Sequence, residues 1–315
     1  MCCNKENRDM LLRKTLLGLF SVLFLLGCTT TDKNSPKKHM LWKISDSNSS
    51  VYLMGSVHFA DRSFYPLDTV ITNAFDASDE LAVELDMSDT AVVKDIAVQT
   101  ELLGKLEEGK TLAQILPEGL LSSFDSLCLS WYIPSEALYG YKPWAAAMTI
   151  GSIAVMRRGF DPRFGIDFFF LHRAHETQKK ILALETVEEQ VNALAGEGVP
   201  DSIGIYYLKS TIRDLRLMDS SITLMMESWK RGDDSLFRTA MYLGEEDGCA
   251  EDSLLQAVID ERVYISRNRK MAESITSFLS SDRKVFIVVG AAHMTGRGDN
   301  VLKLLRDKGL TVEQY

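Results

Sequence analysis

The chain has 315 residues, of which 46% are hydrophobic and 25% charged, a composition that excludes disordered, collagen-like and coiled-coil classes. Its formal net charge of -9 argues against a nucleic-acid partner, because binding to the phosphate backbone requires clustered Lys and Arg. The length is enough for one large domain or two modest ones.

Residues 1–27 have the pattern of an export signal peptide. Arg13 and Lys14 precede an apolar run over 16–27, which is shorter than the roughly 18 apolar residues of a membrane-spanning helix. The run ends in Leu-Leu-Gly directly before Cys28, which resembles a bacterial lipobox. This resemblance implies cleavage before Cys28 and lipid attachment to it; an uncleaved anchor is the alternative. We therefore expect a lipoprotein of the bacterial cell envelope, held on the membrane and facing outside the cytoplasm.

Residues 28–40 are small, polar and basic with one proline, a composition typical of a flexible tether. The folded part is expected over 41–315. It contains two cysteines, Cys128 and Cys249, which in an exported protein could form a disulfide or remain as two buried thiols.

The folded part opens with two apolar stretches, from Leu41 and up to about Met54, on either side of Ser-Asp-Ser-Asn-Ser-Ser. This composition favours a turn, so the segment predicts a β-hairpin. A helix is expected over 66–78, and 81–86 reads as a short strand that ends in carboxylates. The order strand, helix, strand suggests a parallel pair.

Residues 91–160 have helical spacing interrupted at Gly and Pro, which predicts an inserted helical lobe. A helix from about Asp167 then leads to a strand over 181–186, where Thr186 and Glu189 have the spacing of a capping box. More helices run to Arg283. The remaining elements are the strongest strand of the chain, a helix and a terminal strand, at 284–293, 300–309 and 310–315.

Strands near both ends with helices between them predict an α/β fold. We expect one domain with a mixed, largely parallel central sheet, flanking helices and the inserted helical lobe.

Two segments share the pattern of an apolar strand, then Gly, two small or apolar residues, and His. They run from Gly55 to His58 and from Gly290 to His293. Glycine at a strand end permits a sharp turn or a close backbone approach, and the histidine then projects where open α/β sheets bind ligands. The alternative is a pair of unrelated loop histidines.

Two other strands also end in carboxylates, Glu84 and Glu185. Because the carboxyl ends of parallel strands meet at one edge, two imidazoles and one carboxylate could hold a divalent metal there. His58 and His293 would be ligands, with Mn, Co or Zn as the metal. One carboxylate, of Glu84 or Glu185, would be the third ligand, and the other would take the proton from a bound water. Glu84 in an ordinary ion pair and Glu185 as a neighbour of the helix cap are the alternatives.

Three other residues are weaker candidates. His172 and His175 have the i, i+3 spacing of two ligands on one helix face, although a polar surface is favoured. Arg62, four residues after His58, could stabilise an oxyanion, but an exposed loop arginine is the commoner case.

Several motifs together resemble the TraB/GumN family: Gly-Ser-Val-His at 55–58, the segments 81–86, 165–174 and 182–190, the segment 267–275, and Gly-Ala-Ala-His at 290–293. The resemblance spans about 42–315. The family is similar to the Tiki metallopeptidases and more distantly to erythromycin esterases and ChaN-like haem-binding lipoproteins. The resemblance implies that His58, His293 and Glu84 form the site, with the histidines as ligands, Glu84 as a ligand or base and Glu185 as an auxiliary catalytic carboxylate. It also implies that Arg267 and Asn268 are auxiliary residues beside the site.

These observations predict a lipid-anchored, metal-dependent hydrolase of the cell envelope, most readily a peptidase that acts on peptides or secreted proteins. The alternative is a non-catalytic lipoprotein that sequesters a peptide or haem, for which methionines and the Tyr-rich segment 131–144 could line an apolar pocket. An envelope scaffold with a vestigial site is a third interpretation.

Overall fold

The structure, a computed structural model, describes residues 37–195, 199–244, 250–281 and 283–315. The signal peptide, Cys28 and most of the proposed tether lie outside these residues. The described chain forms one compact unit from Lys37 to Tyr315. His39 and Met40, assigned above to the tether, are buried in it. Within the described ranges no helix has the length and apolar character needed to cross a membrane.

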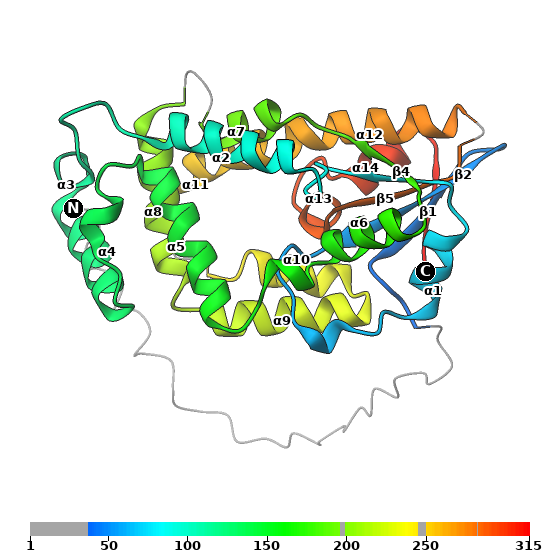
Figure 1. The fold of residues 1–315 in the computed structure, drawn as a ribbon, viewed down its shortest axis with the longest axis horizontal. Helices are drawn as coiled ribbons and strands as arrows, with labels where there is room; N and C mark the ends of the chain where they lie inside the picture. The colour runs from blue at the N-terminus through cyan, green and yellow to red at the C-terminus, as the bar shows by residue number, and fades with distance from the viewer. Residues whose placement is uncertain (1–36, 196–198, 245–249, 282) are drawn as a thin grey trace, which may run out of the picture. The chain divides into compact units, whose positions relative to one another are not determined.

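A six-stranded sheet is the centre of the fold (Figure 1). The strands are β1 (Leu41–Ser45), β2 (Ser50–Ser56), β3 (Glu80–Val83), β4 (Lys180–Ala183), β5 (Val285–Gly290) and β6 (Thr311–Gln314), in the spatial order β4-β3-β5-β2-β1-β6. The strands β4, β3, β5 and β2 run parallel to one another, and β1 is antiparallel to both β2 and β6. The predicted mixed, largely parallel α/β sheet is confirmed.

The hairpin is present as predicted, and its turn is closed by Asp46, whose Oδ1 accepts hydrogen bonds from the N–H groups of Asn48 and Ser49 at 2.7 Å each. The strand that ends near residue 54 and the strand that begins near residue 81 were predicted to be a parallel pair, and here the structure differs. β2 and β3 run in the same direction, but β5 lies between them. A strand from the far end of the chain therefore separates two strands that are neighbours in sequence.

The first half of the chain supplies α1 (Thr69–Asp76), α2 (Thr90–Gly104), α3 (Leu112–Ile115), α4 (Glu118–Ser130), α5 (Pro143–Arg157) and α6 (Ile166–Glu176). The second half supplies α7 (Val187–Ala195), α8 (Asp201–Asp214), α9 (Met218–Arg231), α10 (Asp234–Met241), α11 (Ala250–Asp260), α12 (Ser266–Leu279), α13 (Ala291–Thr295) and α14 (Val301–Asp307). A π-helical turn, Glu261–Ile265, joins α11 to α12.

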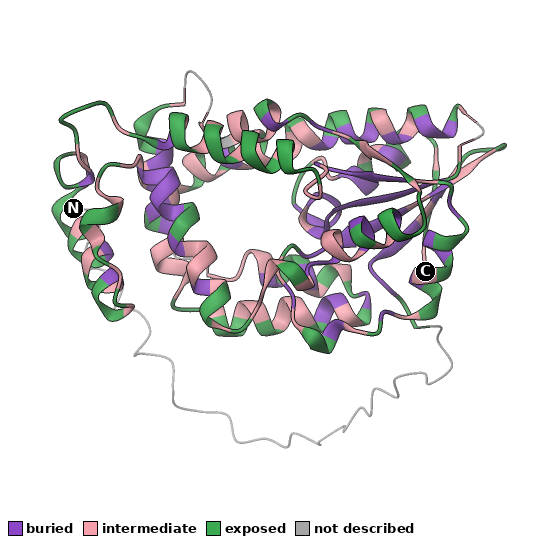
Figure 2. Ribbon diagram, in the orientation of Figure 1, coloured by how far each residue is buried: buried purple, intermediate pink, exposed green. Residues whose placement is uncertain are grey.

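The sheet is covered on both faces, with α1 and α6 on one side and α12 and α14 on the other (Figure 1). From β2 the chain moves in one direction across the sheet to β3 and β4, and it then returns in the other direction to β5. Because crossovers between parallel strands are right-handed, the helices of the outward and return connections lie on opposite faces of the sheet. Phe75 of α1, Phe170 of α6 and Phe286 of β5 pack against one another with ring centroids 4.7–5.5 Å apart. Every residue of β5 is buried, as expected for a central parallel strand (Figure 2).

The inserted helical lobe, predicted over 91–160, has a small hydrophobic core of its own. Leu112, Phe124 and Ile150 are fully buried there, and Leu208 of α8 belongs to the same cluster. The lobe therefore also uses a helix from later in the chain, because α8 packs along α5. Cys128 is buried in this core, while Cys249 lies outside the described residues.

Candidate functional site

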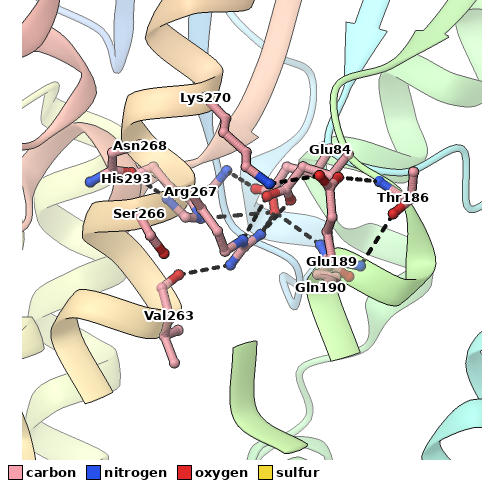
Figure 3. Close-up of polar contacts among 12 residues, drawn as sticks. Glu84, Thr186, Glu189, Gln190, Val263, Ser266, Arg267, Asn268, Lys270 and His293 are labelled. Carbon is pink, nitrogen blue, oxygen red and sulfur yellow. Dashed lines mark hydrogen bonds and ion pairs between the residues drawn. The ribbon is translucent and has the colours of Figure 1, made fainter. Parts of the chain in front are cut away.

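The carboxyl ends of the four parallel strands carry the predicted residues to one edge of the sheet. His58 follows β2, Glu84 follows β3, Glu185 follows β4, and His293 lies in α13 directly after β5. The neighbouring strand order β4-β3-β5-β2 brings these four side chains together. Arg267 and Asn268 reach the same place from the first turn of α12 (Figure 3).

Arg267 connects the two carboxylates. Its Nε donates to Glu185 Oε1 and its Nη2 donates to Glu185 Oε2 and to Glu84 Oε2, each at 2.7 Å. Its Nη1 donates to the carbonyl of Val263 at 2.9 Å. Only 12% of the Arg267 side chain and 1% of the Glu185 side chain are exposed. The charges are thus held together in a dry environment, where an unpaired ion would be strongly unfavourable.

Both oxygens of Glu84 are engaged. Oε1 accepts a hydrogen bond from the N–H of Gly290 at 2.6 Å, and Oε2 accepts from Gln190 at 3.2 Å as well as from Arg267. Burial alone would raise the pKa of Glu84. In the acid range where Glu84 would take up a proton, His293 and His58 are protonated, and their charges with that of Arg267 outweigh burial and hold the pKa at about 2. The carboxylate is therefore ionised at pH 7.

His293 is fixed through its Nδ1 atom, which lies 2.6 Å from Asn268 Oδ1. The Asn268 side chain is itself held by the carbonyl of Asp299, to which its Nδ2 donates at 3.0 Å. Because the amide oxygen accepts, Nδ1 carries the proton and Nε2 keeps its lone pair, 3.9 Å from Glu84 Oε2. Burial lowers the pKa of His293 to about 4, so the ring is neutral at pH 7.

His58 is held in the same way by Asp167, the second residue of α6, with Nδ1 2.9 Å from Oδ2. The Asp167 charge raises the pKa of His58 to about 9, so the ring is protonated at pH 7. Of the His58 side chain, 61% is exposed, and it lines the cavity described below. Its Nε2 is therefore the atom left for a ligand, and a metal that binds there at pH 7 would displace the Nε2 proton.

Gly290 marks the point on which these groups converge. A Cβ atom at this residue would lie 3.3 Å from Glu84 Oε1, 3.5 Å from His58 Nε2 and 3.6 Å from His293 Cδ2. The other glycine of the repeated motif has a different role. A Cβ at Gly55 would lie 2.8 Å from the Met294 methyl carbon, so this glycine lets α13 pack on β2. Both therefore serve close approach, one of the two uses predicted for them.

A cavity of about 530 Å³ opens beside this point. His58, Ser56 and Gly290 lie on its wall at the sheet edge, and Tyr264, packed edge-on against the His293 ring, lies on the wall from the π-helical turn. Much of the remaining wall is apolar and comes from α9 and α10, with the side chains Met218, Ile222, Met225, Met226, Phe237 and Met241. The Tyr-rich segment 131–144, predicted to line such a pocket, is instead part of the helical lobe.

The two histidines have the chemistry of metal ligands, since each Nδ1 is bound to an oxygen acceptor, His58 Nε2 lies at the common point, and His293 Nε2 lies 3.9 Å from Glu84 Oε2. Glu84 has no free oxygen while Arg267 and Gly290 hold it. Among the described residues no group of three or more His, Cys, Asp or Glu side chains is arranged so that it could hold a metal ion. As the side chains lie, only the two imidazoles fit a divalent metal. Glu84 fits as a third ligand only if its Oε2 turns away from Arg267.

A protein-family model matches nearly the whole described part of the chain. The model of the TraB/PrgY/gumN family matches residues 40–314. This chain belongs to that family. It is 23% identical over 273 residues to the uncharacterized protein YbaP of Escherichia coli (strain K12), covering 85% of this chain and 94% of YbaP. An uncharacterized protein of Treponema pallidum (strain Nichols) is 24% identical over 189 residues, covering 57% of this chain and 55% of that protein. No solved structure matches.

Two partners of the site in this TraB/PrgY/gumN chain were not assigned from the sequence. Asp167 was expected only as the start of a helix, although it lies in the motif 165–174 that contributes to the family resemblance. Gln190 follows the capping box, in which Thr186 N–H donates to Glu189 at 2.9 Å and Thr186 Oγ1 accepts from Glu189 N–H at 3.2 Å. This predicted box is confirmed, and by starting α7 it directs Gln190 towards Glu84 (Figure 3).

Three weaker candidates lie elsewhere. Arg62 is exposed, packs over the Phe164 ring with 5.8 Å to its centroid, and lines a separate groove along α6. It is thus not brought together with His58 and Glu84. His172 and His175 are exposed on α6, where His172 lies 3.3 Å from Glu176 and His175 lies 2.7 Å from the Ser88 hydroxyl.

Proposed function

We propose that this protein is a hydrolase of the bacterial cell envelope that cleaves peptides or secreted proteins, with His58, Glu84 and His293 as its reactive centre. One observation carries the proposal. Both histidines are held at Nδ1, and beside Gly290, at the wall of a cavity, His58 Nε2 and the ionised Glu84 lie next to the His293 ring, whose Nε2 is 3.9 Å from Glu84 Oε2. Convergent ionisable groups with shifted pKa values beside a pocket are the usual signature of a reactive site.

A divalent metal is part of this proposal, bound through Nε2 of His58 and His293. Mn, Co and Zn all accept imidazole nitrogen, and such a metal would lower the pKa of a bound water and polarise a carbonyl group. Glu84 would be a third ligand if its Oε2 turned away from Arg267. Arg267 would keep its place, because Glu185 would still accept two hydrogen bonds from it.

The remaining residues position these groups. Asp167 and Asn268 fix the orientation of the two imidazole rings, a task on which metal affinity and activity depend. Glu185 is assigned as the anchor of Arg267, whose charge, after those of His293 and His58, lowers the pKa of Glu84. The Tiki-like peptidase chemistry that the family resemblance implies is consistent with these roles.

Peptide cleavage tests the proposal. Residues 29–315 are incubated with a defined mixture of decapeptides and Mn, Co or Zn, and the products are identified by mass spectrometry. We expect cleavage by the wild type and loss of cleavage in His58→Ala and His293→Ala. His172→Ala is the matched control, because His172 is an exposed histidine on α6 paired with Glu176, and it should cleave normally. Full turnover by both site variants would refute the assignment.

The membrane attachment is a separate proposal that rests on the sequence of the leader. We infer that Cys28 is lipid-modified and that the tether holds the hydrolase outside the cytoplasm. Metabolic labelling with a palmitate analogue should mark the wild type and should not mark Cys28→Ala, which we expect in the soluble fraction. A labelled Cys28→Ala protein would contradict this.

Retention of an apolar ligand without turnover is a second candidate, favoured by the methionines of the cavity wall. Haem is the ligand that the family resemblance suggests. A saturable Soret band during haem titration, together with no peptide cleavage, would support this candidate, and the absence of the band would remove haem.

A further inference from the structure

Ser56 has an unusual hydroxyl group. Within the described residues, its Oγ is the only buried side-chain nitrogen or oxygen without a hydrogen-bond partner. The residue is 2% exposed. A buried polar atom without a partner is unfavourable, so such an atom in a native fold calls for an explanation.

The position of Ser56 links this hydroxyl to the reactive centre. Ser56 is the last residue of β2 and pairs with Gly290 of β5, so the two side-chain positions lie on the same face of the sheet. The Gly290 position is the one that faces Glu84 and His58 at 3.3 and 3.5 Å. Ser56 and Gly290 also lie together on the cavity wall. The Ser56 side chain therefore lies on the face of the sheet that carries the reactive centre.

Two other serines in and near the cavity donate hydrogen bonds to carbonyl groups of helices. Ser221 Oγ donates to the carbonyl of Ala240 at 2.9 Å, and the fully buried Ser228 Oγ donates to the carbonyl of Met225 at 2.9 Å. Ser56 lies at the end of a strand, where no carbonyl of a preceding helical turn is in reach. Its cross-strand neighbour is a glycine, which offers no side-chain partner.

We infer that Ser56 is a substrate-binding residue whose hydroxyl donates a hydrogen bond to a carbonyl oxygen of the bound peptide. The substrate is then a peptide with a large apolar side chain next to that carbonyl, because the cavity wall includes side chains such as Met225, Met226 and Phe237. Among the residues described as lining it there is no Lys or Arg, whereas Asp214 and Asp260 are present, so an acidic substrate side chain is disfavoured. This inference rests on the proposed function, whose centre supplies the place of the carbonyl group.

Binding of a blocked tetrapeptide, acetyl-Ala-Leu-Leu-Ala-amide, tests the inference. Titration into metal-free protein, followed by NMR, avoids cleavage during the measurement. We expect Ser56→Ala to bind about tenfold more weakly than the wild type, the effect of one lost hydrogen bond. Ser221→Ala should bind normally, because the Ser221 hydroxyl already has a partner. The Gly-Gly analogue should bind the wild type more weakly than the Leu-Leu peptide.

Thermal unfolding separates this role from a structural one. Removal of an unpaired hydroxyl should raise the Tm of Ser56→Ala, by on the order of 2 °C, whereas Ser228→Ala should lower the Tm by a similar amount. A lower Tm in Ser56→Ala would mean that the hydroxyl has a structural partner and would overturn the inference. Equal peptide affinity in wild type and Ser56→Ala, or no binding by the wild type, would do so as well.

The proposed function can fail without this inference failing. If the wild type binds the tetrapeptide through Ser56 but cleaves no peptide in the presence of Mn, Co or Zn, the hydrolase is refuted and the peptide-binding role of Ser56 is retained.

Discussion

The buried bridge between Arg267 and Glu185 should be the strongest ion pair in the protein. Two hydrogen bonds of 2.7 Å connect the guanidinium to a carboxylate that is 1% exposed. In Arg267→Met the two carboxylates lose their cation in a dry environment, for which we expect a loss of about 3–5 kcal/mol in the free energy of unfolding. That is a large part of the ~5–15 kcal/mol stability of an ordinary protein.

A double-mutant cycle measures the bridge itself. Urea unfolding of the wild type, Arg267→Met, Glu185→Gln and the double variant should give a coupling free energy of about 2–3 kcal/mol. The matched control is the exposed pair Arg231 and Glu227, which are 3.3 Å apart with side chains 67% and 53% exposed. Its coupling should be about 0.3–0.5 kcal/mol. A coupling of Arg267 with Glu185 no larger than that of the control would refute the argument that burial and geometry make this pair special.

Three further predictions follow from the site and from one buried histidine. Asp167→Asn should weaken metal binding by about 10–100-fold, measured by calorimetry, because His58 loses the carboxylate that orients its ring; unchanged affinity would contradict this. Gly290→Ala should unfold within about 1 kcal/mol of the wild type, yet lose peptide cleavage, because the added methyl occupies the point between the histidines and Glu84; normal turnover would show that this point is not used. Burial lowers the pKa of His39 below its ordinary 6.5, so the unfolded chain takes up the proton first and stability falls as the pH drops below about 6.5. His39→Gln should therefore lose less stability than the wild type between pH 7 and 5.5 in urea titrations, and an identical loss would show that His39 does not contribute.

The strands could be predicted well because their signals are local. The apolar run of β5 and the Ser-Asp-Ser-Asn-Ser-Ser turn of the hairpin each identify their own structure. The neighbour of β2 could not be predicted in this way. The sequence suggested β3, whereas β5 pairs with β2 from more than 200 residues away, and no local pattern carries that information.

The prediction of the site residues from the sequence was limited in the same way. Residues on strand ends, such as Glu84 and His293, could be found because strand direction brings them to one edge. Asp167 and Gln190 come from helices whose contact with that edge depends on tertiary packing. Arg267 and Asn268 were candidates through the family resemblance alone, and the structure supplies their contacts, a bridge of two carboxylates and the anchor of His293.

The central claim of this account is that His58 and His293 present their Nε2 atoms to one common centre. Nitrogen NMR of the labelled histidine rings during titration with Zn²⁺ tests it most directly, because the spectra distinguish Nδ1 from Nε2 in each ring. We predict that the Nε2 signals of both rings change together and saturate at about one metal per chain, while both Nδ1 atoms keep their protons. A response from one ring alone, or from neither, would contradict the claim.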